Sequence, residues 1–132
     1  GVTPKYRQHL IRMGKTGVGA VDIPPNSVQL TEAYFPLRSA ARVESFQPHM
    51  HLRGKAMTLE AMLPTGTSVV LSHVAEFDFN WHTSYVYADD AAPLLPKGTI
   101  IKVKAWHDNT AASRGNPDPN VWVGYGQRTV DE

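Results

Sequence analysis

The chain has 132 residues, with thirteen lysines and arginines, twelve aspartates and glutamates and no cysteine. This length suits one domain with one hydrophobic core, and the near-neutral charge gives no electrostatic support for a nucleic-acid partner. No apolar stretch approaches the about 20 residues of a membrane-spanning helix, so no membrane span is expected. Without cysteine there are no disulfides, no thiol catalysis and no thiolate-bound metal. A metal in these residues needs histidine, methionine or oxygen ligands.

We expect a single domain over residues 1–132, with an N-terminal arm or inter-domain segment at residues 1–20. The best helix candidate in this arm, near Tyr6 to Met13, is short, basic and without a capping residue. Isolated helices of this length are unstable in water. The sequence therefore predicts an extended segment there.

Beyond the arm, short apolar runs are separated by turn signals: PPN at 24–26, PTG at 64–66 and PKG at 96–98. The run after the third signal alternates, with one face made of Ile101, Val103, Ala105 and His107 and the other containing Lys102 and Lys104. This period of two is typical of a half-buried strand, and no stretch shows a helical period. Residues 108–120 are polar and predict a long loop. The pattern predicts an all-β fold, an antiparallel β-sandwich of the jelly-roll type.

The stretch FQPHMHLRGKAM, residues 46–57, contains the histidine pair, His49 and His51. We expect it in a strand that starts at Ala40, where residues i and i+2 point to the same face, so the two imidazoles would lie side by side as metal ligands. Pro48 removes a backbone donor just before them, which favours a strand edge or a bulge. The alternative stays open, because two neighbouring surface histidines need not bind anything.

A third ligand is not fixed by the residues alone. His107 and His82 are weaker metal candidates, since a strand end and an aromatic cluster explain them equally well. A methionine beside two imidazoles favours copper, above all Cu(I). Met50 is expected on the opposite face of its strand, and Met57 and Met62 are expected in the core. The polar residues that could orient the imidazoles are Gln47, Asp78, Asn80 and Asn109.

Several motifs resemble one family. PHMHLRGK is similar to the copper-ligating H-x-H-x-x-G-K segment of the second domain in the copper type II, ascorbate-dependent monooxygenases, whose animal members are the peptidylglycine and dopamine monooxygenases. Further segments resemble bacterial relatives in the same order, some of them fused to cytochrome c modules: VDIPPN, EFDFNWH, LPKGTIIKVKAWHDNT, NPDP and GYGQRTVDE. The similarity covers most of residues 21–132. The absence of the animal enzymes' disulfides fits a bacterial branch.

The resemblance implies that this chain is the second, oxygen-binding copper domain, with one copper ion held by His49 and His51. In the family a methionine completes this site, and by the resemblance it would follow Glu132. Met13, Met50, Met57 and Met62 do not occupy the matching position.

The family's first domain holds a three-histidine copper that supplies electrons. The implied partners are therefore dioxygen, an organic substrate whose C–H bond is hydroxylated, and an N-terminal electron-supplying copper domain or a cytochrome c module. The implied location is periplasmic or secreted. The chain in isolation is not expected to turn over.

Two other functions fit the same residues. One is a copper-binding or copper-delivery module without oxidation chemistry, which a histidine pair with methionine neighbours would also serve. The other is a structural or interaction β-sandwich that keeps the fold with a degenerate site. Reductant-dependent product formation by the full-length protein would exclude the copper-delivery module. Inability of the chain extended past Glu132 to hold stoichiometric copper would support the structural β-sandwich.

Overall fold

The computed structural model describes residues 8–13 and 21–125. Within these residues the chain forms strands and no helix, and all strand pairs are antiparallel. The strands are β1 (Asp22–Ile23), β2 (Val28–Pro36), β3 (Ala41–Arg42), β4 (Ser45–Phe46), β5 (Gly54–Met62), β6 (Ser68–Val74), β7 (Tyr85–Val86), β8 (Leu94–Leu95), β9 (Ile100–Asp108) and β10 (Val123–Gly124). The prediction of an all-β, antiparallel fold is confirmed. None of the described residues belongs to a helix that could cross a membrane.

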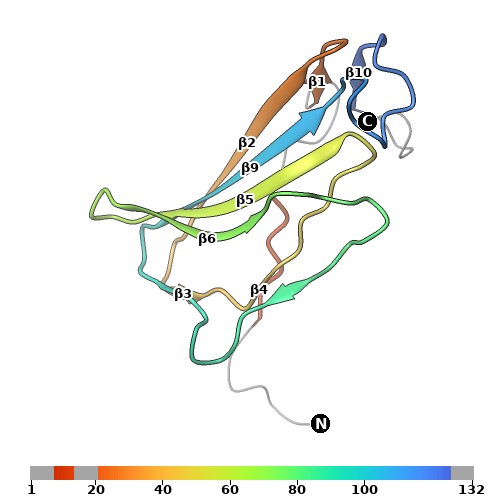
Figure 1. The fold of residues 1–132 in the computed structure, drawn as a ribbon. Coiled ribbons are helices and arrows are strands. Elements are labelled where there is room, and N and C mark those ends of the chain that lie inside the picture. The colour runs from red at the N-terminus through yellow and green to blue at the C-terminus, as the bar shows by residue number, and fades with distance from the viewer. Residues whose placement is uncertain (1–7, 14–20, 126–132) are drawn as a thin grey trace.

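The largest sheet has four strands in the order β2-β9-β5-β6 (Figure 1). The hairpin predicted at 64–66 joins β5 to β6, and its turn is closed by two backbone hydrogen bonds, from Gly66 N to Leu63 O at 2.9 Å and from Leu63 N to Thr67 O at 2.8 Å. β9 follows the PKG signal, as predicted, and the PPN signal separates β1 from β2. The long loop predicted at 108–120 contains no strand after Asp108.

A second layer covers one face of this sheet. The short pairs β3-β8 and β4-β7 lie below it in the view of Figure 1. The core between the layers consists of Met57, Leu59, Ala61, Ile101, Val103 and Ala105 from the sheet and Leu37, Phe46, Met50 and Leu95 from the segments that face it. This arrangement fits a β-sandwich, while the jelly-roll order of strands stays a prediction. Met62 is 37% exposed, so its predicted place in the core is wrong.

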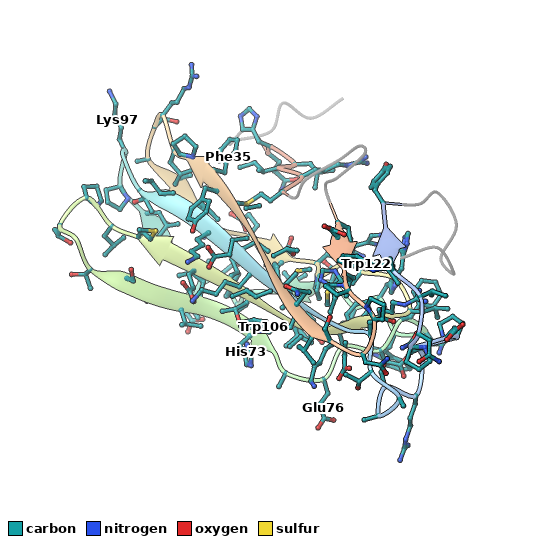
Figure 2. The ribbon with its side chains drawn as sticks, turned by 90° about the horizontal axis from the view of Figure 1, so that it is seen from above. Phe35, His73, Glu76, Lys97, Trp106 and Trp122 are labelled. Atoms are coloured by element: carbon teal, nitrogen blue, oxygen red, sulfur yellow. The ribbon has the colours of Figure 1, made fainter. Side chains whose placement is uncertain are left out.

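The outer face of the sheet contains Lys102 and Lys104, as the alternation in β9 predicts, together with exposed apolar side chains on β2 such as Leu30. Lys102 Nζ lies 2.6 Å from Glu32 Oε1 on β2, and Lys104 Nζ lies 2.6 Å from Glu60 Oε1 on β5. The ring of Trp106 on β9 lies 6.4 Å from the ring of His73 on β6, centroid to centroid (Figure 2). These cross-strand pairs tie the neighbouring strands together on the side away from the core.

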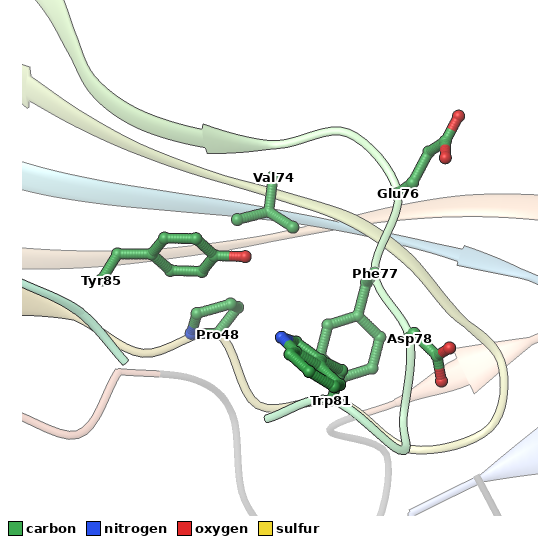
Figure 3. Close-up of a pocket in the computed structure, with 7 residues that line it drawn as sticks. All are labelled: Pro48, Val74, Glu76, Phe77, Asp78, Trp81 and Tyr85. Carbon is green, nitrogen blue, oxygen red and sulfur yellow. The ribbon is translucent and has the colours of Figure 1, made fainter. Parts of the chain in front are cut away.

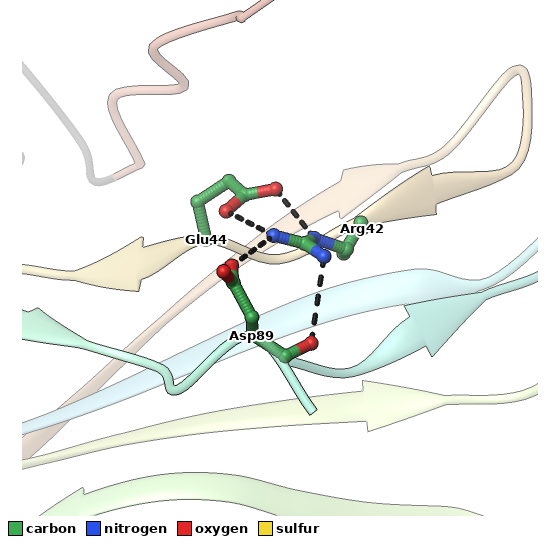
Figure 4. A network of polar contacts seen from close by, with 3 residues as sticks. All are labelled: Arg42, Glu44 and Asp89. Carbon is green, nitrogen blue, oxygen red and sulfur yellow. Dashed lines mark hydrogen bonds and ion pairs between the residues drawn. The ribbon is translucent and has the colours of Figure 1, made fainter. Parts of the chain in front are cut away.

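An exposed ion-pair network holds the second layer at its edge (Figure 4). The Arg42 guanidinium donates from Nε to Glu44 Oε1 at 2.7 Å and from Nη2 to Asp89 Oδ1 at 3.0 Å. Exposed pairs of this kind contribute little to stability. The network joins β3 to Asp89 after β7, and we expect it to add little to the stability of the second layer.

The strand predicted from Ala40 through the histidine pair is wrong. It is broken into β3 and β4, and residues 47–53 belong to no strand. Pro48 cannot donate to a strand neighbour, and a turn follows at once, closed by Gly54 N donating to His51 O at 2.9 Å. The segment nevertheless keeps an alternating burial pattern, in which Phe46, Pro48 and Met50 are buried.

Candidate metal centre

The histidine pair lies beside a third histidine from a distant part of the chain. The ring centroids of His49 and His51 are 5.4 Å apart, and those of His49 and His82 are 4.8 Å apart. His49 is exposed, while His51 and His82 are half-buried. We call these three residues the histidine cluster. Its position at the surface leaves it accessible to a metal ion and to small molecules.

Alternating burial places the histidine pair on one side of its segment. Because Pro48 and Met50 are turned inward, His49 and His51 are turned outward together. The predicted side-by-side arrangement of the two imidazoles thus exists without the predicted strand. The buried Met50 points away from the pair into the core, as predicted.

The chain after β6 brings His82 to this place. Phe77 N donates to Lys55 O at 2.8 Å, which anchors the segment to the start of β5. Asp78 then forms a tight turn, in which its Oδ1 accepts from Asn80 N at 2.8 Å. Gln47 Nε2 donates to the backbone oxygen of His82 at 3.4 Å. These contacts fold the segment back over the histidine pair.

Two phenylalanines form an apolar wall beside His82. The ring centroid of Phe79 is 5.1 Å from that of His82 and 6.3 Å from that of His51, and the centroid of Phe77 is 5.6 Å from that of His82. Neither phenylalanine is identified by the sequence as part of a site. The alternation F-x-F immediately before Asn80-Trp81-His82 is the signal that could have indicated it.

The spacing of the cluster fits a shared metal ion. An imidazole nitrogen lies about 1.2 Å from its ring centroid and about 2.0 Å from a bound metal, so two rings that share one ion at an angle of about 110° have centroids about 5 Å apart. The two measured distances, 5.4 and 4.8 Å, agree with this value. His82 Nε2 is buried and has no hydrogen-bond partner within residues 8–13 and 21–125. An unsatisfied buried nitrogen is costly unless something binds it.

The rings are close but not yet oriented around one point. They meet edge to face, with interplanar angles of 78° and 82°. Accordingly, no group of three histidine, aspartate or glutamate side chains in the described part of the chain is already arranged to hold a metal. Rotation of the imidazoles about their side-chain bonds would be needed to turn their nitrogens toward one ion.

The remaining histidines of the described strands lie elsewhere. His73 is exposed on the outer face of the sheet, where its Nδ1 lies 2.7 Å from Thr58 Oγ1. His107 lies near the end of β9, opposite Gly54 of β5, and makes no ring contact with the histidine cluster in the described structure. The structure thus groups His82, and not His107, with the pair.

His107 makes stability depend on pH. Burial lowers its pKa below the ordinary histidine value, and its Nδ1 is buried without a hydrogen-bond partner among the described residues. Below about pH 6.5 the unfolded chain therefore binds a proton that the folded chain resists, and the free energy of unfolding falls by up to about 1.4 kcal/mol per pH unit. Between pH 7 and pH 5, the free energy of unfolding measured in urea should fall less in His107→Leu than in the wild type. Equal losses would contradict this assignment.

Of the polar residues expected to orient the imidazoles, Gln47 donates to the backbone oxygen of His82 and not to an imidazole nitrogen of that residue. Asp78 and Asn80 shape the turn that precedes His82. Asn109 is fully buried, and its side chain forms hydrogen bonds with residues outside the histidine cluster.

Asn109 connects the long loop to the turn after the histidine pair. Its Oδ1 accepts from Arg53 Nε at 3.1 Å and from Asn116 Nδ2 at 3.0 Å, and its Nδ2 donates to the backbone oxygens of Pro24 at 3.0 Å and Val121 at 2.9 Å. Arg53 belongs to the turn that follows His51. The loop at 108–120 therefore contacts, through Asn109, the turn next to the histidine pair.

The same loop approaches this turn at its backbone. A Cβ atom added to Gly115 would lie 2.7 Å from the carbonyl oxygen of Leu52, the residue after His51. Only glycine permits this approach. The function of the long loop is therefore, at least in part, to hold the turn that carries His51.

Replacing Asn109 by alanine is expected to lower the free energy of unfolding by about 2 kcal/mol, because Arg53 and two backbone oxygens lose a buried partner. Urea unfolding measures this loss. The matched control is Asn120→Ala, since the Asn120 side chain makes an exposed hydrogen bond to Asn26 and should change stability by less than about 0.5 kcal/mol. Equal effects of the two substitutions would contradict the supporting role of Asn109.

Comparisons of the chain with protein-family models, with curated proteins and with solved structures give no match.

Proposed function

We propose that this chain is a copper-binding domain in which His49 and His51 hold one copper ion, and that it is the oxygen-binding half of a two-domain, ascorbate-dependent monooxygenase. The observation that carries the proposal is the outward-facing histidine pair at a spacing that suits one shared ion. The order of family-like motifs supports the choice of family. Imidazole ligands without any thiolate fit a copper that cycles between Cu(I) and Cu(II).

The third ligand has two candidates. His82 lies 4.8 Å from His49 between ring centroids and has a buried, unsatisfied Nε2. The methionine expected after Glu132 lies outside the described residues. If His82 binds the ion, His82→Ala should weaken copper binding, whereas the exposed His73→Ala should not. If the methionine is the third ligand, both variants should bind copper like the wild type.

Copper, when bound, supplies the one-electron chemistry by which O₂, two electrons and two protons convert a C–H bond to C–OH and release water. The residues of this chain hold the ion and shape its surroundings. The imidazoles bind as neutral ligands, and the exposed position of His49 leaves one side of the site open. Phe77 and Phe79 place apolar rings beside His82.

The electrons would come from a partner, either an N-terminal electron-supplying copper domain or a cytochrome c module, with ascorbate as the reductant of the family. On the same resemblance we propose a periplasmic or secreted location. The other partners would be dioxygen and an organic substrate.

The test uses the natural full-length protein loaded with copper. We expect ascorbate-dependent oxygen consumption that is lost in His51→Ala and retained in His73→Ala. Stoichiometric copper binding without any such oxygen consumption would overturn the monooxygenase and favour a copper-delivery module. Absence of stoichiometric copper would favour a structural β-sandwich.

A further inference from the structure

A pocket opens beside the histidine cluster. It has a volume of about 250 Å³ and is lined by Pro48, Val74, Glu76, Phe77, Asp78, Trp81 and Tyr85. In Figure 3, Tyr85 lies on one side of this space and Trp81 with Phe77 on the other, with Pro48 and Val74 between them. We call it the aromatic pocket. Its volume is below the range of drug-sized sites, so it suits a small ligand.

The walls of the aromatic pocket combine aromatic rings with negative charge. Three of the lining side chains are aromatic, two are carboxylates and none is cationic. The carboxylates of Glu76 and Asp78 point away from the space in Figure 3, so they contribute a negative potential at the rim and not direct contacts. Trp81 is 74% exposed and Tyr85 is 43% exposed, so both rings are accessible to a ligand from solvent.

We propose that the aromatic pocket binds a small alkylammonium ion. The faces of tryptophan, tyrosine and phenylalanine attract cations, and methylated ammonium groups are bound in this way because their charge is weakly hydrated. A neutral apolar ligand would gain from the same rings but not from the negative rim. An anionic ligand would be repelled by Glu76 and Asp78.

The aromatic pocket adjoins the proposed copper site through Phe77, which lines the pocket and has its ring centroid 5.6 Å from that of His82. A ligand in the aromatic pocket would therefore share Phe77 as a neighbour with His82 of the histidine cluster. That this ligand is a substrate rests on the proposed function. Binding itself does not, because none of the lining residues belongs to the cluster.

The test is a titration of the metal-free chain with choline, followed by NMR of the indole N–H groups of its three tryptophans. The matched neutral ligand is 3,3-dimethyl-1-butanol, which has the same shape with carbon in place of the charged nitrogen. We expect saturable choline binding, centred on the Trp81 signal and at least about 10-fold tighter than binding of the neutral alcohol. Equal affinities, or shifts centred on Trp106 or Trp122, would overturn the proposal.

Substitutions of lining residues, compared with a substitution outside the pocket, test whether the aromatic pocket is where choline binds. Trp81→Leu should reduce choline affinity about 10-fold or more, and Glu76→Gln should reduce it by a few-fold in low salt. Trp122→Leu, which removes an exposed tryptophan that does not line the pocket, should leave it unchanged. Unchanged affinity in Trp81→Leu would overturn the proposal.

Copper titration of the same samples keeps the two proposals distinct. Choline binding by a chain that does not bind copper supports the aromatic pocket and overturns only the copper site. Copper binding by a chain that does not bind choline supports the copper site and overturns only the aromatic pocket.

Discussion

Replacing either histidine of the pair by alanine is expected to reduce the affinity of the chain for Cu(I) by more than about 100-fold, because the loss of a direct ligand costs more than the 10- to 100-fold loss seen on removal of a ligand's hydrogen-bond partner. The proposed copper site depends on His49 and His51, which face outward together with their ring centroids 5.4 Å apart. Competition with a Cu(I)-specific chelator measures the affinity. One equivalent should bind to the wild type.

His73→Ala is the matched control for this pair of substitutions. His73 is exposed on the outer face of the four-stranded sheet, next to Thr58 and on the side of the sheet away from the core. It should bind copper like the wild type. If all three alanine variants lost affinity equally, or if none did, the assignment of the copper ion to His49 and His51 would be wrong.

Gly54→Ala is expected to lower the free energy of unfolding by about 2–3 kcal/mol and to weaken copper binding at the same time. A Cβ atom at this position would lie 2.6 Å from Met50 Cβ, 2.8 Å from Phe77 Cδ1 and 3.1 Å from the backbone oxygen of His51. Overpacking of this kind forces neighbouring atoms to move, at a cost of about 1–3 kcal/mol or more. The atoms that must move belong to Met50 and His51, next to and within the histidine pair, and to Phe77 of the apolar wall.

Gly124→Ala is the control, since within residues 8–13 and 21–125 its added Cβ would meet the backbone oxygen of Val21, at 4.0 Å, and no other atom. It should change neither stability nor copper affinity. Urea unfolding and chelator competition on the same two variants provide both readouts. A Gly54→Ala variant as stable as Gly124→Ala would contradict the close packing of Met50, Phe77 and His51 around Gly54.

Much of the fold could be predicted because its signals are local. The PTG and PKG motifs are turn sequences, and the alternation in β9 directly reflects a strand with one buried face. The burial of Ile101, Val103 and Ala105 follows from that alternation. The jelly-roll order depends on how distant strands pair, for which the sequence carries no local signal.

The candidate site was predictable only in part. Same-side placement of His49 and His51 follows from alternation, which survives even though the strand does not. The prediction of a strand through the histidine pair was wrong because Pro48 cannot donate a backbone hydrogen bond and because a turn closes at Gly54. His82 and His107 could not be ranked from sequence, since the position of His82 depends on the contact from Phe77 N to Lys55 O, between residues far apart in the chain.

The most direct test of the central claim is copper X-ray absorption spectroscopy of the chain loaded with one equivalent of Cu(I). Copper held by His49 and His51 predicts two or three imidazole nitrogens at about 2.0 Å, with one fewer in His51→Ala. A spectrum with oxygen ligands and no imidazole scattering, or one that is identical in His51→Ala, would contradict the proposed copper site.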